Sequence, residues 1–136
     1  MEKIKEFFKN DRFAGYIGIE LVEAGPGTAV ARLKIEERHL NGVGIVHGGA
    51  VFSLADLAFA VASNSHGTVA LAINADIAFL KAASEGVLTA RAREVSRNRK
   101  LATYRIDVTD SDDEMIAVFQ GTVYRKKDIL PFPASS

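Results

Sequence analysis

The chain contains no cysteine, few prolines and no excess of charge of either sign. Without cysteine it cannot form disulfides, thiolate metal sites or a cysteine nucleophile. Its 17 basic and 17 acidic residues cancel to a formal net charge of zero. A global attraction to nucleic acid or to an anionic membrane is therefore not expected, which leaves only local charged patches.

Long apolar segments are also missing. The longest apolar run, 54–62, is interrupted by Asp56 and is too short to span a bilayer. Residues 1–16 carry charges every few positions and have no apolar centre of the kind that a signal peptide needs. We therefore expect a cytoplasmic protein that has no membrane partner.

Several catalytic motifs are absent as well. There is no G-x-S-x-G elbow, so a serine triad is not expected. There is no phosphate-binding loop of the G-x-x-x-x-G-K-[ST] kind. His39, His47 and His66 stand apart, without an H-x-x-x-H pair, so we expect no metal site.

What is present is typical of one soluble globular domain: 136 residues, of which 48% are hydrophobic and 25% charged. We expect a single domain over 1–136, with an N-terminal helix within 1–12 and a loose tail over 128–136. The next expected elements are a strand after the turn at 25–27, a loop over 36–46 and a long helix that starts at 48 and stops at Gly67. Four further strands are expected, at 69–80, 87–95, 101–109 and 115–125. One helix followed by antiparallel-looking strands is an α+β pattern.

The long helix is apolar on almost all sides, so it cannot lie on a sheet with one side in water. A wrapping sheet, a second subunit or both must cover it. The polar residues Ser53, Asp56 and Ser63 have spacings of three and seven, which place them on one narrow stripe. A buried carboxylate is costly unless it is paired, hydrogen-bonded or neutralised. Asp56 is thus either a structural acid that pairs or caps, or a functional group.

The helix begins with His47, Gly48 and Gly49. Glycines let a ligand approach the backbone, and the first N–H groups of a helix lack intrahelical partners and favour negative charge. A tight turn is the alternative interpretation. Asp56 follows Gly48 by eight residues, about 12 Å at about 1.5 Å per residue. The two groups cannot serve one carbonyl within a chain, but two copies with antiparallel helices bring them together.

The segments 40–67 and 73–83 resemble the hotdog-fold acyl-CoA thioesterases of the phenylacetic-acid-degradation type, and the likeness covers roughly 13–126. Its most specific part is the H-G-G triplet with an acid nine residues after the histidine. The resemblance implies a long central helix wrapped by a curved antiparallel sheet. It also implies a homodimer at minimum, a double hotdog, and a homotetramer by analogy.

The resemblance further implies a role for each site residue. Asn41 is the loop amide, His47 supports the loop and the thioester, and the N–H of Gly48 donates to the thioester oxygen. Asp56, from the partner subunit, is the general base or the nucleophile. Asn74 stands where the family often has Ser or Thr near the attacking water, a departure from the pattern.

Coenzyme A is expected as part of the substrate, with no other cofactor. The densest basic patch holds Arg97, Arg99 and Lys100, which is either a solvated turn or the site of the coenzyme A phosphates. A further apolar set either lines an acyl pocket or belongs to the core: Phe52, Leu57, Phe59 and Phe79.

The sequence therefore predicts an acyl-CoA thioesterase that converts aryl- or medium-chain acyl-CoA to free acid and coenzyme A. One alternative is a hotdog dehydratase or hydratase of acyl thioesters, which needs a histidine paired with the carboxylate across the dimer. Another is a non-catalytic acyl-CoA sensor, against which Asp56 and Asn41 argue.

Overall fold

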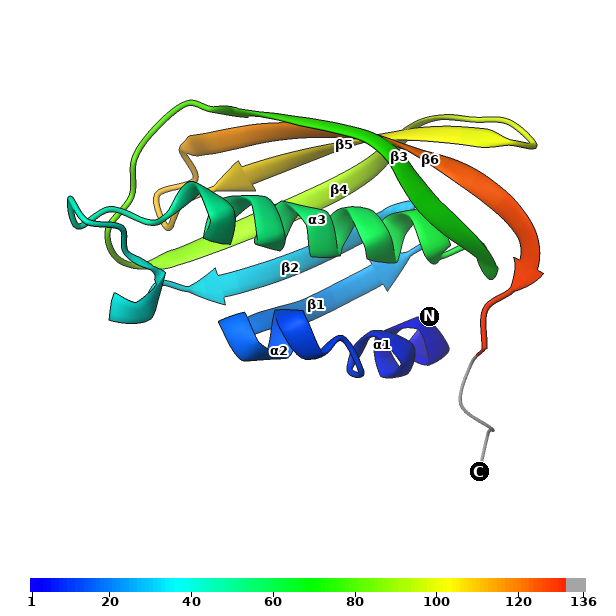
Figure 1. The fold of residues 1–136 in the computed structure, drawn as a ribbon, viewed down its shortest axis with the longest axis horizontal. Helices are drawn as coiled ribbons and strands as arrows, with labels where there is room; N and C mark the ends of the chain where they lie inside the picture. Colours follow the sequence, from blue (N-terminus) through cyan, green and yellow to red (C-terminus); the bar gives the residue numbers. More distant parts are fainter. Residues whose placement is uncertain (132–136) are drawn as a thin grey trace.

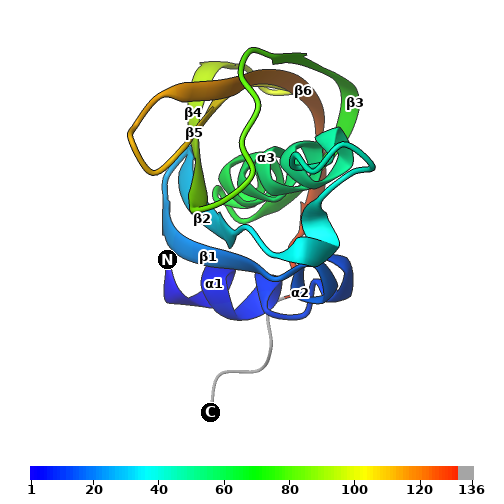
Figure 2. The same ribbon diagram turned by 90° about the vertical axis from the view of Figure 1, so that its left-hand side faces the viewer.

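One long helix lies inside a curved sheet in the computed structural model, which describes residues 1–131 (Figures 1 and 2). The helix is α3, Gly48–Asn64. The sheet is antiparallel, with strand order β1-β2-β4-β5-β6-β3. Its strands are β1 (Ile19–Gly25), β2 (Thr28–Lys34), β3 (Thr68–Phe79), β4 (Val87–Arg97), β5 (Leu101–Thr109) and β6 (Met115–Ile129). The shorter helices are α1 (Glu2–Phe8), α2 (Arg12–Ile17) and the 3-10 turn η1 (Glu37–His39). The predicted α+β class is confirmed.

The expected strands after α3 agree with β3 to β6 to within a few residues at each end. The expected loose tail over 128–136 is wrong at its start, because Ile129 pairs with Thr68 at the end of β6; residues 132–136 lie outside the described part. The expected helix within 1–12 is present as α1, Glu2–Phe8, and a second short helix, α2, begins at Arg12.

Three elements were not predicted: β1, α2 and the 3-10 turn η1 within the expected loop over 36–46. Strand β1 has a bulge between Leu21 and Glu23, which interrupts the regular change of side chains from one face to the other. Its sequence therefore lacks the regular alternation of apolar and polar residues that predicts a strand. Helix α2 has six residues, of which only Ala14 is buried. Such a short segment shows no helical periodicity.

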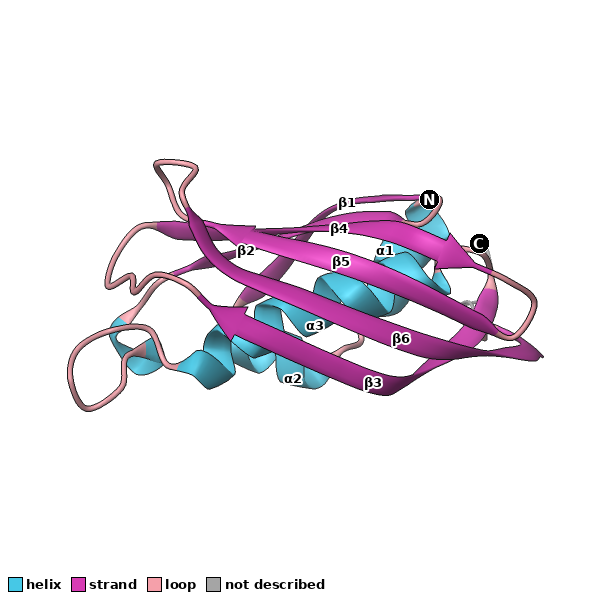
Figure 3. Cartoon of the chain, turned by 90° about the horizontal axis from the view of Figure 1, so that it is seen from above, coloured by secondary structure: helices cyan, strands magenta, loops and turns pink. Residues whose placement is uncertain are grey.

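The connections place β3 at the edge of the sheet (Figure 3). The loops over 98–100 and 110–114 connect the hairpins β4–β5 and β5–β6. The loop over 80–86 crosses from the edge strand β3 to β4, an interior strand of the sheet. Among residues 1–131, no strand pairs with the outer edge of β3. One long strand is therefore left with unpaired backbone groups.

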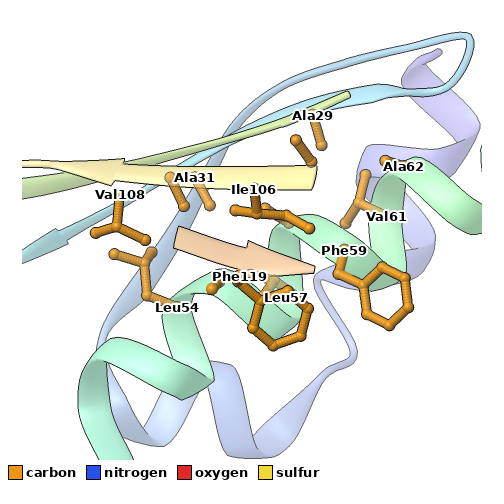
Figure 4. Packing of buried hydrophobic residues seen from close by; sticks show 14 of the residues in the cluster. Ala29, Ala31, Leu54, Leu57, Phe59, Val61, Ala62, Ile106, Val108 and Phe119 are labelled. Carbon is orange, nitrogen blue, oxygen red and sulfur yellow. The ribbon is translucent and has the colours of Figure 1, made fainter. Parts of the chain in front are cut away.

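Helix α3 packs on the sheet through aromatic side chains (Figure 4). The ring of Phe59 lies directly over Gly121 of β6, where a Cβ atom would stand 2.6 Å from it. Phe59 also contacts Phe119 and Tyr104, with ring centroids 5.4 Å and 6.0 Å away. Phe59 is thus a core residue rather than part of an acyl pocket, and Phe52 lies against Phe119 at 5.2 Å.

The end of α3 is held by a partly buried polar cluster. Glu94 of β4 accepts hydrogen bonds from His66 Nε2 (2.8 Å) and from the Tyr104 hydroxyl (2.9 Å). Burial alone would raise the pKa of Glu94, but these two bonds and the neighbouring Arg97 lower it. The Ser65 hydroxyl accepts from the N–H of Gly27 at 2.8 Å. The end of the helix is thereby fixed relative to β4, β5 and the β1–β2 turn.

Nothing in residues 1–131 has both the length and the apolar character that a helix needs to cross a membrane.

Candidate active site

The start of α3 is organised by His47. Its ring Nδ1 accepts a hydrogen bond from the N–H of Gly49 at 2.8 Å, which makes His47 the N-cap of the helix. The backbone N–H of His47 donates to the carbonyl of His39 at 2.7 Å. His47 thus holds the loop, and because Nδ1 accepts, the neutral ring carries its proton on Nε2.

The N–H of Gly48 is left without an acceptor in residues 1–131. It is the first N–H of α3 and lies at the positive end of the helix dipole. A Cβ atom at Gly48 would stand 3.2 Å from the ring of Phe79, so the glycine allows this ring to approach the backbone. A free donor next to open space is what an oxyanion requires.

Gly48 lines a hollow of about 330 Å³, here called the Gly48 hollow, together with Asn41, Val51, Phe79 and Lys81. The Oδ1 of Asn41 accepts from the N–H groups of Val43 (3.0 Å) and Ile45 (3.3 Å), which holds the loop in shape. Lys81 pairs with Asp110 at 3.1 Å and with Glu114. The structure therefore brings Asn41, Gly48 and Phe79 together.

Asp56 lies on an open stripe of α3 in the single chain. It is exposed rather than buried, which corrects the expectation, because the segment that borders it, from Asp11 to Ala14, leaves its carboxylate open to solvent. Ser63, expected on the same stripe, is instead buried, and its hydroxyl donates to the carbonyl of Ala60. Within residues 1–131 Asp56 forms no hydrogen bond and no ion pair. The structural interpretation of this acid therefore lacks the partner it needs.

Beside Asp56 is a hollow of about 50 Å³, the Asp56 hollow, lined also by Asp11, Phe13, Ala14, Ile19, Ser53, Leu57 and Ala60. Desolvation by these largely apolar neighbours raises the pKa of Asp56, and the negative charge of Asp11 raises it further. Asp11 is itself the N-cap of α2 and accepts from the N–H of Ala14 at 3.0 Å. A carboxylate in this setting is a better base than one in water.

The Gly48 hollow and the Asp56 hollow share no lining residue. Along the helix axis their two key groups are about 12 Å apart, at about 1.5 Å per residue. Asn74 lies exposed on edge strand β3 and lines neither hollow. One protomer therefore does not bring Asn74, Asp56 and Gly48 into a single site.

The predicted basic patch is only partly a cluster. Arg99 and Lys100 line a hollow of about 510 Å³, the basic hollow, whose other residues are Tyr124, Arg125, Lys126, Lys127 and Asp128. Arg97 lies outside it, 3.8 Å from the Glu94 carboxylate. The basic run over 125–127 was missed because strand pairing, not sequence proximity, brings it beside the β4–β5 turn.

A metal site finds no support in the described residues 1–131, which contain no group of three or more His, Asp or Glu side chains suited to hold an ion.

Known proteins resemble this chain in sequence and in structure. The model of the thioesterase superfamily matches residues 43–129, more than half of the chain. A protein of Archaeoglobus fulgidus that is provisionally named an esterase is 44% identical over 133 residues, covering 96% of this chain and 86% of that one. The acyl-coenzyme A thioesterase PaaI of Escherichia coli is 35% identical over 119 residues, covering 87% and 85%.

The structure of the E. coli PaaI protein superposes with a TM-score of 0.90 and 32% identity, covering 94% of each chain. The predicted hotdog fold is thereby confirmed. Two of the sequence relatives, one bacterial and one human, are named as acyl-coenzyme A thioesterases. This chain belongs to the thioesterase superfamily and is a hotdog-fold thioester hydrolase of the PaaI type.

Proposed function

We propose that this chain hydrolyses aryl- or medium-chain acyl-CoA to free acid and coenzyme A, at a site that two copies share. The observation that carries the proposal is a pair of unsatisfied groups on one helix. Within residues 1–131, Gly48 offers an N–H without an acceptor, Asp56 offers an unpaired carboxylate, and each lies in a hollow of its own. Two antiparallel copies of α3 would join each donor to the other copy's acid.

The edge strand β3 supports such an assembly. No strand in the described residues pairs with its outer edge, and Leu71, Ile73 and Phe79 are 52%, 61% and 55% exposed. A long apolar edge strand is a template for pairing with another chain. A second copy that pairs there would extend the sheet and cover the open stripe of α3. We propose a dimer on this basis; a tetramer and a cytoplasmic location stay predictions.

The chemistry follows from the two groups. The thioester oxygen accepts the N–H of Gly48, which stabilises the negative charge that develops on it. Asp56 of the other copy takes a proton from water as the water oxygen bonds to the carbonyl carbon. The tetrahedral intermediate then breaks its C–S bond, and the coenzyme A sulfur leaves and takes up the proton. Direct attack by Asp56, giving an anhydride that water opens, uses the same residues.

Asn41, His47 and Asn74 complete the proposed site. Asn41 lines the Gly48 hollow and keeps its Nδ2 without an acceptor in residues 1–131, so this amide is available to substrate. His47 positions the helix start by capping it. We propose that Asn74, exposed on β3, approaches the attacking water once β3 meets its partner.

We also propose that the basic hollow binds the coenzyme A phosphates, mainly through Arg99, Lys100 and Arg125. Charged hydrogen bonds to phosphate are worth more than neutral ones. Replacing both Arg99 and Lys100 by alanine is expected to raise the KM for acyl-CoA by about tenfold with little change in kcat. Kinetics on acyl-CoA and on the same acyl group carried by pantetheine, which lacks the adenosine phosphates, provide the test. An equal loss on both substrates would contradict the assignment.

Desolvation of Asp56 and, to a smaller extent, the charge of Asp11 are expected to determine the acid limb of the pH–rate profile. Activity needs the ionised form of Asp56, so kcat falls as the pH drops through the pKa of this group. Because Asp11 raises that pKa, Asp11→Asn should move the acid limb to lower pH. Asparagine is as good an N-cap as aspartate, so α2 should keep its start. A profile that does not move would show that Asp11 does not act on the base.

The function itself is tested by thiol release from a panel of acetyl-, hexanoyl- and phenylacetyl-CoA, before and after dialysis against a chelator. Thiol release that does not need a metal is the expected result. Hydration of an enoyl-CoA without thiol release would favour the hydratase alternative, and tight binding without any reaction would favour the sensor.

A further inference from the structure

We infer that α2 is the acyl-binding wall of the active site, with Phe13 against the acyl group and the space beneath α1 and α2 receiving its far end. This inference rests on the proposed thioester hydrolysis and adds the element that selects the acyl group.

The first observation is the position of Phe13. Its side chain is 67% exposed, yet it lines the same hollow as Asp56. It makes no ring contact with another aromatic side chain in residues 1–131. An apolar ring held in water beside the reactive carboxylate gains from contact with an apolar group that arrives there.

The second observation is a larger space that adjoins the Asp56 hollow. A larger cavity of about 320 Å³, the α1–α2 cavity, lies between α1, α2 and β1. It shares with the Asp56 hollow the lining residues Asp11, Ala14, Ile19 and Leu57. Phe8 and Leu21 add apolar surface to it, and its other charged residues are Lys5, Lys9 and Glu20. An acyl chain longer than the small hollow therefore has somewhere to go.

The third observation is charge, which identifies the part of the substrate that enters. Two carboxylates, Asp11 and Asp56, line the Asp56 hollow and would repel the coenzyme A phosphates. The cationic side chains of Arg99, Lys100 and Arg125 gather in the basic hollow, which shares no residue with the α1–α2 cavity. The uncharged acyl group is thus the part that suits the α2 side.

The fourth observation is that both ends of α2 are tied down. Asp11 caps its start. At its end, Arg38 Nη1 donates to the carbonyl of Tyr16 at 2.7 Å, and the buried His39 donates through Nε2 to the carbonyl of Ile17 at 2.6 Å. A six-residue helix held in this way presents Phe13 in a defined place, as a specificity-determining residue must be presented.

Phe13→Ala tests the contact, with Tyr16→Ala as the matched control. Tyr16 is on the same helix, 85% exposed, and lines neither space. We expect Phe13→Ala to lower kcat/KM for hexanoyl- and phenylacetyl-CoA by about tenfold and to leave acetyl-CoA unchanged. Tyr16→Ala should match the parent on all three substrates. An equal loss on acetyl-CoA, or no loss on any substrate, would overturn the inference.

Gly15 offers a second test, in the larger space. It lines the α1–α2 cavity, and a Cβ atom there would meet nothing within 4 Å, so a side chain enters open space. Gly15→Phe should lower kcat/KM for decanoyl-CoA by about tenfold relative to butanoyl-CoA, while Gly15→Ala leaves the ratio unchanged. An unchanged ratio in Gly15→Phe would place the acyl chain elsewhere. If the parent protein releases thiol from none of the acyl-CoA substrates, the proposed function fails. If the parent does release thiol but the variants keep the parent's acyl preferences, only the assignment of α2 as the acyl-binding wall fails.

Discussion

Asp56→Asn is expected to lower kcat for acyl-CoA hydrolysis by about 10³-fold. Asparagine has nearly the same shape as aspartate but cannot take a proton from water or attack the thioester. Because Asp56 is exposed and makes no hydrogen bond or ion pair in residues 1–131, the exchange removes no structural contact. Single-turnover thiol release measures the loss, and circular dichroism verifies the fold.

The same variant should be no less stable than the parent at neutral pH. The raised pKa of Asp56 means that the folded protein disfavours the ionised carboxylate. The resulting loss of folding stability begins as the pH rises above the ordinary aspartate pKa, and it is complete above the pKa of Asp56 in the folded protein. Asp56→Asn removes it, so its Tm at neutral pH should equal or exceed that of the parent, and the difference should vanish at low pH.

Asp112→Asn is the matched control for both measurements, because Asp112 is an exposed carboxylate in the β5–β6 turn and lines neither hollow. It should leave kcat and Tm unchanged. A kcat in Asp56→Asn above about a tenth of the parent value would be too high for the loss of a general base or nucleophile, and the acid would have to be another residue.

Gly48→Pro is expected to lower kcat by about 10²–10³-fold, the usual cost of losing one oxyanion donor. Proline deletes the N–H that has no acceptor in residues 1–131, and it is well tolerated at the first position of a helix. The preceding residue, His47, has φ −61° and ψ 135°, an extended conformation that suits a residue before proline. The helix should therefore persist.

Gly48→Ala is the control, because it also places a Cβ atom near Phe79 but keeps the N–H. That Cβ would stand 3.2 Å from a ring that is 55% exposed and has room to shift. The ratio of kcat between the alanine and proline variants thus isolates the donor. Equal activities in the two variants would show that the N–H of Gly48 does not bind the oxyanion.

Sequence patterns located most of this fold because its long elements have clear periodicity. Strand β5 shows it plainly, whereas helix α3 was located by its long apolar segment and by the H-G-G triplet at its start. Helix α2 gave no such signal, so Phe13 was not recognised as a neighbour of Asp56. The cap residue Asp11 at its start was the one local indication.

The environment of the site residues was harder to predict than their identity. The apolar sequence around Asp56 suggested that this carboxylate is buried. Whether one side of a helix is buried depends on what packs against it, and a single chain leaves Asp56 exposed. Arg125 joins Lys100 only through the pairing of β5 with β6. Contacts between distant strands are set by register, which the local sequence does not reveal.

The central claim, that each site takes Gly48 from one copy and Asp56 from the other, is tested by mixing two inactive variants. Asp56→Asn and Gly48→Pro chains are unfolded, combined in equal amounts and refolded, and thiol release from hexanoyl-CoA is measured. A mixed dimer has one site with both groups intact and one with neither, so random pairing should restore about a quarter of the parent activity. Activity no greater than that of the separate variants refolded alone would contradict a shared site.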